Sequence, residues 1–317
     1  MKKKNLLASI AIGAGTLVTS AAIGYYALSE HLYNKMIRRQ RWIEDSDEEA
    51  FEDENYLMYD LEEELITWEE RVESEHVYIT AFDQLELAGE CYHPEIESNR
   101  WAVIARGNDL NPFALRNVAM EFHAKGYHVL IADNRGYGGS EGRYMAFGWH
   151  DRLDLMAWID YIVSQDETAQ IVLYGVSMSA AGVMMAGGEE LDEHVRCIIE
   201  DSGFTSAYEL LSGIIKTDYG IRAPFILEGV DSLTRLRARF SLKSASAVRQ
   251  LRKTSLPILF IHGEEDEFVP LEHVFRLYHA AAGEKELYTV PYADHGEAMF
   301  APRYFERVMM FCDRYVE

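Results

Sequence analysis

The chain has 317 residues, 48% of them hydrophobic, so a large core can be buried and disorder throughout is excluded. Its net charge of -23 excludes a nucleic-acid-binding protein, because such proteins need a basic surface against the phosphates. The cysteines Cys91, Cys197 and Cys312 show neither a disulfide framework nor metal-ligand spacing, so we expect small buried side chains.

The first 43 residues do not resemble a globular sequence. Three lysines at positions 2–4 precede an uncharged run from Leu6 to Leu28. The run has 23 residues, and a helix needs roughly 20 to cross a bilayer. Residues 1–43 are therefore predicted to be an N-terminal transmembrane helix with its flank.

The fate and orientation of this segment follow from its small and basic residues. Ser20, Ala21 and Ala22 resemble a signal-peptidase site, so cleavage stays open, but the apolar run continues past them, which favours an uncleaved anchor. A short Lys-rich tail before an apolar run is typical of a signal anchor. We expect a single-pass protein of the cell membrane whose globular part lies outside the cytoplasm.

Residues 44–75 form an acidic stretch, with sixteen Asp or Glu and a single Arg. Leu57, Leu61, Leu65 and Trp68 recur at helical spacing and form one apolar stripe. The pattern predicts a solvated spacer whose stripe packs on the domain that follows.

Residues 76–317 alternate between short apolar runs and helical patterns. Strands are expected over 76–82, 85–92, 101–105, 128–132, 171–174, 195–200, 258–261 and 287–290. Helices are expected over 112–125 and 148–164, after 177, from 270 and from 302. This alternation predicts one α/β domain with a mostly parallel central sheet flanked by helices. Residues of about 204–250 are mainly helical and break the alternation.

Ser177 follows a buried strand directly and precedes a helix rich in small residues. A Gly-x-Ser in that setting is typical of a nucleophile elbow, in which a strained turn holds the serine hydroxyl above the sheet. Ser179 stands where the usual motif has a second glycine. A Gly-x-Ser alone is also compatible with an ordinary strand–helix turn.

Two later loops supply partners for this serine. Asp266 and His295 each follow an apolar strand, and the order Ser, Asp, His is the one expected for a catalytic triad on this fold. Glu265 and Glu267 flank the acid, but the motif favours Asp266.

Other polar residues are interpreted as structural. Asp294 adjoins His295 but is not expected to face it, and His262 is interpreted as a buried hydrogen-bonding side chain. His273 and His279 do not share a helix face, and no HExxH pattern occurs, so neither a metal site nor a cofactor is predicted.

From about residue 76 onward the chain resembles the α/β-hydrolase superfamily, especially single-anchor bacterial hydrolases related to serine aminopeptidase-like and esterase proteins. The resemblance rests on residues 133–140 (DNRGYGGS), the elbow and the acid loop 262–270. It implies that residues 204–250 form a cap. It also implies an oxyanion hole from the backbone N–H groups of Asn108 and Met178. Arg106 departs from the family pattern, since a histidine is common before Gly107, and it could alter substrate preference.

The resemblance implies a serine hydrolase that cleaves carboxylic esters through an acyl-enzyme on Ser177. A serine peptidase acting on short peptides and an acyltransferase would use the same residues. A non-catalytic, membrane-anchored binding module is the alternative from another class. The expected partners are a small ester or peptide and, through the N-terminal helix, a membrane.

Overall fold

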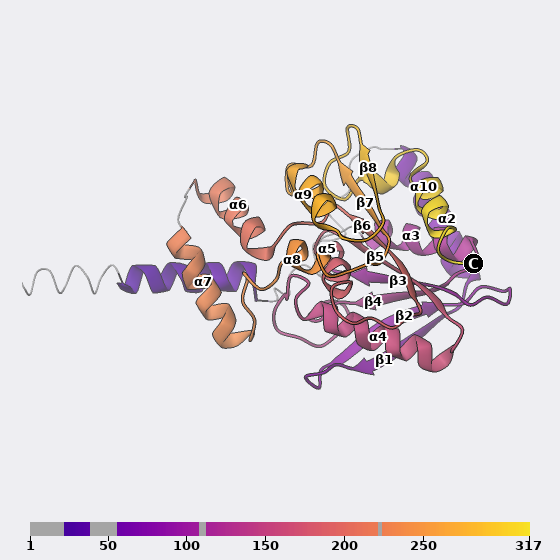
Figure 1. Ribbon diagram of the computed structural model, residues 1–317, viewed down its shortest axis with the longest axis horizontal. Helices are drawn as coiled ribbons and strands as arrows, with labels where there is room; N and C mark the ends of the chain where they lie inside the picture. Colours follow the sequence, from indigo (N-terminus) through magenta and orange to yellow (C-terminus); the bar gives the residue numbers. More distant parts are fainter. Residues whose placement is uncertain (1–21, 39–55, 108–111, 221–223) are drawn as a thin grey trace, which may run out of the picture.

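A single eight-stranded sheet forms the centre of the molecule (Figure 1). The structure is a computed structural model, which describes residues 22–38, 56–107, 112–220 and 224–317. The strands are β1 (Ser74–Thr80), β2 (Glu86–Tyr92), β3 (Arg100–Arg106), β4 (His128–Asp133), β5 (Gln170–Val176), β6 (Val195–Asp201), β7 (Ile258–Gly263) and β8 (Lys285–Val290). Their order is β1-β2-β4-β3-β5-β6-β7-β8. The β1–β2 and β2–β4 pairs are antiparallel and the others parallel, which confirms the predicted mostly parallel sheet.

Helices cover both faces of this sheet. They are α2 (Tyr56–Arg71), α3 (Pro112–Ala124), α4 (Asp151–Gln165), α5 (Met178–Ala186), α6 (Ala207–Tyr219), α7 (Pro224–Arg237), α8 (Ala247–Leu251), α9 (Glu272–Ala280) and α10 (Tyr304–Cys312). One apolar cluster joins the sheet to α4, α5, α8 and α9, and a second joins it to α2, α3 and α10. The central strand β5 is buried along nearly its whole length because both of its faces are covered.

The acidic stretch contributes α2, which packs against the body. Leu65 and Trp68 are buried in the second cluster. The Trp68 indole N–H donates to His123 Nδ1 at 3.3 Å. The side chains of Leu57 and Leu61 lie outside the described part of the chain.

The cap consists of α6 and α7, which extend beyond one end of the sheet, and the chain then returns through α8 (Figure 1). Ser206 precedes α6, and its hydroxyl accepts from the Glu209 N–H, while Gly220 follows the helix in the left-handed region. Both features are usual helix caps. Two long helices and one short one thus occupy the region that the sequence analysis expected to be helical, 204–250.

Residues 22–38, which the sequence assigned to the anchor and its flank, pack against the α/β domain. Residues 22–36 form a helix that lies beside α7, and Leu32, Tyr33, Met36 and Ile37 are buried in the first apolar cluster. These four side chains share one helix face, so the helix can pack there while its basic residues stay at the surface.

Residues 6–21 of the predicted transmembrane segment lie outside the described residues. Within the described ranges, no helix combines the length and the apolar character that crossing a bilayer requires. The last part of the predicted run, 22–28, is the beginning of the helix that packs on the cap.

Candidate active site

Ser177 lies in a strained turn between β5 and α5. Its φ of 54° and ψ of -116° are outside the regions that side-chain-bearing residues usually adopt. The turn is tight enough that a Cβ on Gly175 would lie 2.5 Å from the backbone carbonyl of Ser179. The Ser177 N–H donates to the carbonyl of Asp201 at 2.8 Å, which ties the turn to the end of β6. Ser177 therefore has the backbone geometry of a nucleophile elbow.

Ser179, which replaces the usual elbow glycine, takes part in a buried hydrogen bond. Its hydroxyl accepts from the side-chain amide of Asn134 at 3.0 Å. A Cβ on Gly107 would lie 2.9 Å from the same hydroxyl oxygen, so the loop after β3 passes directly over it. The serine thus connects the elbow with the loops after β3 and β4.

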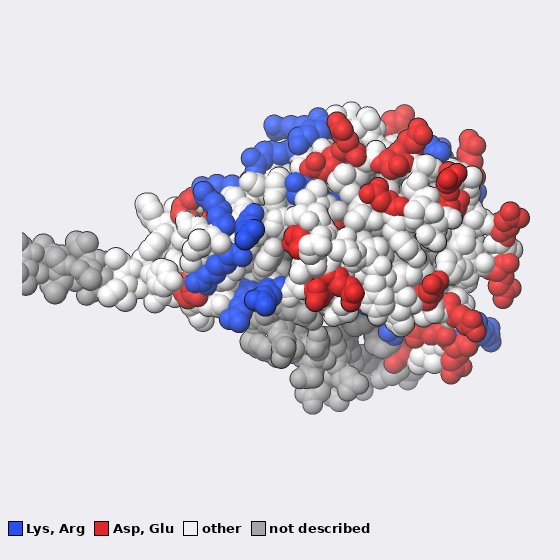
Figure 2. Space-filling model, turned by 90° about the horizontal axis from the view of Figure 1, so that it is seen from below, with Lys and Arg blue, Asp and Glu red and all other residues white. Residues whose placement is uncertain are grey.

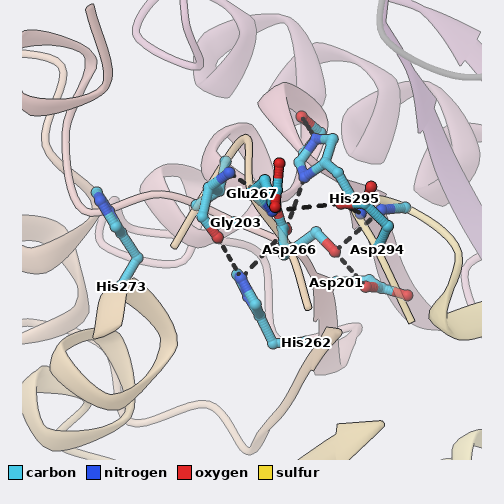
Figure 3. A network of polar contacts seen from close by, with 12 residues as sticks. Asp201, Gly203, His262, Asp266, Glu267, His273, Asp294 and His295 are labelled. Carbon is cyan, nitrogen blue, oxygen red and sulfur yellow. Dashed lines mark hydrogen bonds and ion pairs between the residues drawn. The ribbon is translucent and has the colours of Figure 1, made fainter. Parts of the chain in front are cut away.

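Asp266 lies in the loop after β7 and is buried. Its Oδ1 accepts from the Val269 N–H at 2.7 Å, while its Oδ2 lies 2.7 Å from His295 Nδ1 and 3.2 Å from His262 Nε2. Figure 3 shows the carboxylate between the two imidazoles. Burial by itself would raise the pKa of Asp266, but hydrogen bonds from His262 and His295 outweigh it and lower the pKa to about 2.

His295 connects this carboxylate with the serine. Its Nδ1 faces Asp266 and its Nε2 lies 2.7 Å from the Ser177 hydroxyl oxygen. Because an ionised carboxylate only accepts hydrogen bonds, Nδ1 carries the proton, and Nε2 then accepts from the serine O–H. The structure therefore brings together the three side chains that the sequence predicted, in a continuous hydrogen-bonded chain.

The other acidic residues considered for the triad do not take the place of Asp266. Glu265 and Glu267 are exposed on the two sides of Asp266. Asp294 accepts hydrogen bonds from the N–H groups of His295 and Glu267 at 2.7 and 3.3 Å, so it holds the histidine loop against the acid loop.

His262 is fully buried and bonds to the acid loop. Its Nε2 lies 2.7 Å from the carbonyl oxygen of Val269 and close to Asp266. His273 lies apart, with its Nδ1 accepting from the Thr205 N–H at 3.2 Å (Figure 3). Within the described part of the chain, neither histidine forms a hydrogen bond with Ser177. No cluster of His, Cys, Asp or Glu that could bind a metal occurs among the described residues.

The structure describes one of the two predicted oxyanion-hole donors, Met178. Met178 is the first residue of α5, and the N–H groups of a helix's first turn have no partner within the helix. The Met178 N–H is thus placed beside the nucleophile. Asn108 lies outside the described residues. Arg106 pairs with Asp133, with Nε 2.5 Å from Oδ1, so the guanidinium charge is balanced at the carboxyl ends of β3 and β4.

A buried polar network behind the triad was not predicted. The Asp201 carboxylate accepts from the hydroxyls of Ser202 and Tyr304 at 2.9 and 2.8 Å. Ser202, whose φ is 55°, accepts from the Gly296 N–H at 3.4 Å and thus contacts the histidine loop. The sequence signal was the polar segment 200–203 (EDSG) at the end of an apolar strand.

Glu200, in the same network, is fully buried. Its Oε2 accepts from the Gly203 N–H at 3.1 Å, while Oε1 has no partner among the described residues. Burial, together with the neighbouring Asp201 charge, raises the pKa of Glu200 well above its usual value. The raised pKa favours the neutral form of this side chain.

An apolar cavity of about 160 Å³ opens beside Ser177. The cavity is lined by Met36, Met145, Phe147, Ser177, Met178, Phe204, Leu210, Leu211, Ile214 and Phe268. Met36 belongs to the N-terminal helix, a contribution that the sequence analysis missed because it assigned residues 1–43 to the anchor and its flank.

Comparison with known proteins agrees with this fold. Residues 59–232 match the model of the X-Pro dipeptidyl-peptidase (S15) family. The uncharacterised protein YqkD of Bacillus subtilis is 25% identical over 214 residues, which cover 67% of this chain and 70% of YqkD. The α/β hydrolase domain-containing protein WAV2 of Arabidopsis thaliana is 28% identical over 165 residues, about half the length of each protein.

Solved structures show the same fold. The Pyrococcus furiosus esterase Pf2001 superposes with a TM-score of 0.61 at 21% identity, covering 83% of this chain and 95% of the esterase. The Pyrococcus horikoshii acylaminoacyl peptidase superposes with a TM-score of 0.57 at 22% identity, covering 77% of this chain and 42% of the peptidase. Because the family model spans more than half of the sequence, the chain belongs to the X-Pro dipeptidyl-peptidase (S15) family of the α/β-hydrolase superfamily.

Proposed function

We propose that this member of the serine hydrolase superfamily cleaves carboxylic esters through an acyl-enzyme on Ser177. The observation that carries the proposal is the hydrogen-bonded chain from Ser177 Oγ through His295 to Asp266, with 2.7 Å at each step. This is the arrangement that activates a serine hydroxyl as a nucleophile.

The reaction proceeds in two halves. His295 Nε2 takes the serine proton as Ser177 Oγ attacks the ester carbonyl, and the N–H groups of Met178 and Asn108 stabilise the oxyanion. The imidazolium, held by Asp266, returns the proton to the departing alcohol. Water then attacks the acyl-enzyme, His295 accepts a proton from it, and the carboxylic acid leaves as Ser177 recovers its proton.

The cavity favours an ester over a peptide. Its described lining is apolar apart from Ser177. A site that binds a peptide terminus needs charged or hydrogen-bonding partners for it, because an unpaired buried terminus costs binding energy. A serine peptidase acting on short peptides is the second candidate, and the description of the matching family favours it.

Labelling with a fluorophosphonate tests the activated serine. The full-length chain is compared with Ser177→Ala, His295→Ala and the surface control Ser212→Ala, which lies on the exposed side of α6. We expect labelling at Ser177 in the parent and the control, none in Ser177→Ala and much less in His295→Ala. A folded parent chain that takes no label would refute the proposal and favour the binding module.

A panel of esters and short peptides then separates the two candidates. Ester cleavage at least about tenfold faster than cleavage of any matched peptide supports an esterase, and the opposite ranking supports a peptidase. Transfer of the acyl group to an added alcohol in place of water would indicate an acyltransferase.

We also propose that the chain is anchored in the cell membrane through the apolar run 6–28, with the hydrolase domain outside the cytoplasm. Figure 2 shows Lys and Arg gathered at the end of the molecule from which the N-terminal helix projects. Residues 204–253 contain nine Lys or Arg and four Asp or Glu, in a chain whose net charge is -23. Such a surface suits anionic lipid headgroups.

Exposed apolar side chains at the same end support this proposal. Ile23, Tyr26, Phe225 and Leu236 are each more than half exposed, on the N-terminal helix and on α7. Cysteine labelling tests the orientation, because the three native cysteines are buried. In intact cells, an impermeant maleimide should label a full-length Glu97→Cys variant. Labelling only after lysis would place the domain in the cytoplasm.

A further inference from the structure

The N-terminal helix forms one wall of the cavity beside Ser177. Met36, near the end of the helix over 22–36, lies among lining residues that otherwise come from the loop after β4, the elbow, residues 204–214 and the acid loop. We propose that Met36 limits the length of the acyl group, and that the preferred ester carries a straight acyl chain of about six carbons. This inference rests on the proposed ester hydrolysis.

Contacts on several sides hold this wall in place. The backbone carbonyl of Ile37 accepts from the Met145 N–H at 2.8 Å, and Arg38 forms an antiparallel bridge with Tyr144. Met145 itself lines the cavity. The segment after the helix is thus hydrogen-bonded to the loop that forms the neighbouring wall.

The helix is also tied to the cap. Glu30 pairs with Arg237 of α7, and the Tyr25 hydroxyl donates to the carbonyl of Phe225 at 2.9 Å. A Cβ on Gly229 would lie 2.1 Å from the Ser29 hydroxyl oxygen, so the two helices approach closely at this glycine. The position of Met36 is therefore determined by the fold.

The volume of the cavity indicates the size of the group that it can hold. Its volume of about 160 Å³ is close to that of an engineered apolar cavity of about 150 Å³ that holds one benzene molecule, about six carbons. With the ester carbonyl at Ser177 Oγ, the acyl chain extends over an apolar lining. Each methylene that the cavity accepts should raise kcat/KM about fourfold, and further methylenes should add nothing or reduce it.

Methionine suits a wall of this kind because its side chain is unbranched and flexible. Shortening it to alanine removes three heavy atoms and extends the cavity toward the N-terminal helix. Replacing it with tryptophan fills the same space. The two changes should therefore alter the preferred chain length in opposite directions.

The test uses the full-length chain and p-nitrophenyl esters with acyl chains from two to twelve carbons. In the parent, kcat/KM should rise up to about six carbons. Met36→Ala should shift the optimum to longer chains by about two or three carbons. Met36→Trp should lower the ratio of kcat/KM for hexanoate to that for acetate at least about tenfold.

Matched controls separate a local effect from a general one. Met310, on α10, is 62% exposed, and Met310→Ala should leave the profile unchanged. Met36→Leu keeps the volume and should keep the optimum. Fluorophosphonate labelling of Ser177 in each variant shows that the elbow is intact, and Met36→Ala alone suffices if the tryptophan variant does not fold.

The outcomes distinguish this inference from the proposed function. Absence of hydrolysis of every ester by a labelled parent chain contradicts the ester hydrolase itself. Hydrolysis with the same chain-length optimum in the parent and in Met36→Ala overturns the role of Met36 while the esterase stands. A shift seen with alkyl acetates, in which the alcohol part varies, but not with the acyl series would assign the cavity to the alcohol and overturn the acyl assignment.

Discussion

The guanidinium of Arg237 in α7 donates through both terminal nitrogens to the carboxylate of Glu30, at 2.6 and 2.7 Å. This pair joins the cap to the N-terminal helix. Because Met36 lies on the same helix, the pair bears indirectly on the cavity beside Ser177.

We predict a small coupling between Glu30 and Arg237. Both side chains are about one-third exposed, and such a pair contributes roughly 0.2–1 kcal/mol. Urea unfolding of Glu30→Gln, Arg237→Gln and the double variant should give a coupling energy in that range, reduced by high salt. Zero coupling at low salt would mean that other contacts hold the helix.

Asp266→Asn should lower kcat/KM for an ester by about 10⁴ without unfolding the protein, because the amide cannot hold His295 in the tautomer that accepts the serine proton. The measurement is steady-state hydrolysis. The control is Glu265→Gln, at the adjacent exposed carboxylate, which should keep most of the activity. Comparable losses in the two variants would contradict the assignment of the acid.

Replacing Ser179 with the usual elbow glycine should destabilise this protein. The substitution leaves the buried Asn134 amide without its acceptor, which costs roughly 1–3 kcal/mol in the free energy of unfolding. Chemical denaturation of Ser179→Gly measures it. In an Asn134→Ala background the same change should cost less, and a cost as large as in the parent would show that the hydrogen bond is not the cause.

Glu200→Gln should stabilise the protein increasingly as the pH rises. The folded-state pKa of Glu200 is raised, so in the parent the free energy of unfolding falls from about pH 4.5 upward, until the folded-state pKa is reached. Glutamine does not ionise, so this position no longer lowers the free energy of unfolding as the pH rises. The difference between the two proteins should grow by up to about 1.4 kcal/mol per pH unit.

Unfolding in urea at pH 4.5, 5.5 and 6.5 checks this prediction. The exposed Glu97→Gln variant serves as the control and should track the parent at every pH. A difference between Glu200→Gln and the parent that does not change with pH would mean that Glu200 is ionised in the folded state.

Two glycine-to-alanine substitutions should change the stability of the protein in opposite directions. At Gly175 the new methyl would lie 2.5 Å from the Ser179 backbone, so the elbow must shift, with a cost of roughly 1–3 kcal/mol or more and loss of fluorophosphonate labelling. At Gly213, inside α6, no atom of the described residues, apart from the helix's own adjacent backbone and the two chain neighbours, lies within 4 Å of the new methyl. Alanine there should add up to about 1 kcal/mol of stability. Thermal unfolding with labelling compares the two, and normal labelling of Gly175→Ala would argue against a tight elbow.

The alternation of strands and helices was predictable because it depends on local periodicity. Gly175 and Ser177 marked the elbow for a similar reason, since a sharp turn between a strand and a helix needs small residues next to the nucleophile. The choice of Asp266 over Glu265 and Glu267 came from motif resemblance. Its physical basis, the inward direction of one side chain in the acid loop, appears only when that loop packs against the histidine loop.

The sequence by itself determined the sheet, the cap as a helical insertion and the order of the three candidate catalytic residues, because these follow from patterns within short segments. Only the tertiary structure decided that the helix over 22–36 packs on the cap and that Met36 lines the cavity beside Ser177. Likewise, the raised pKa of Glu200 depends on burial by neighbours distant in the chain. Contacts between distant segments leave no periodic signal in either segment, and for that reason the fold had to be known first.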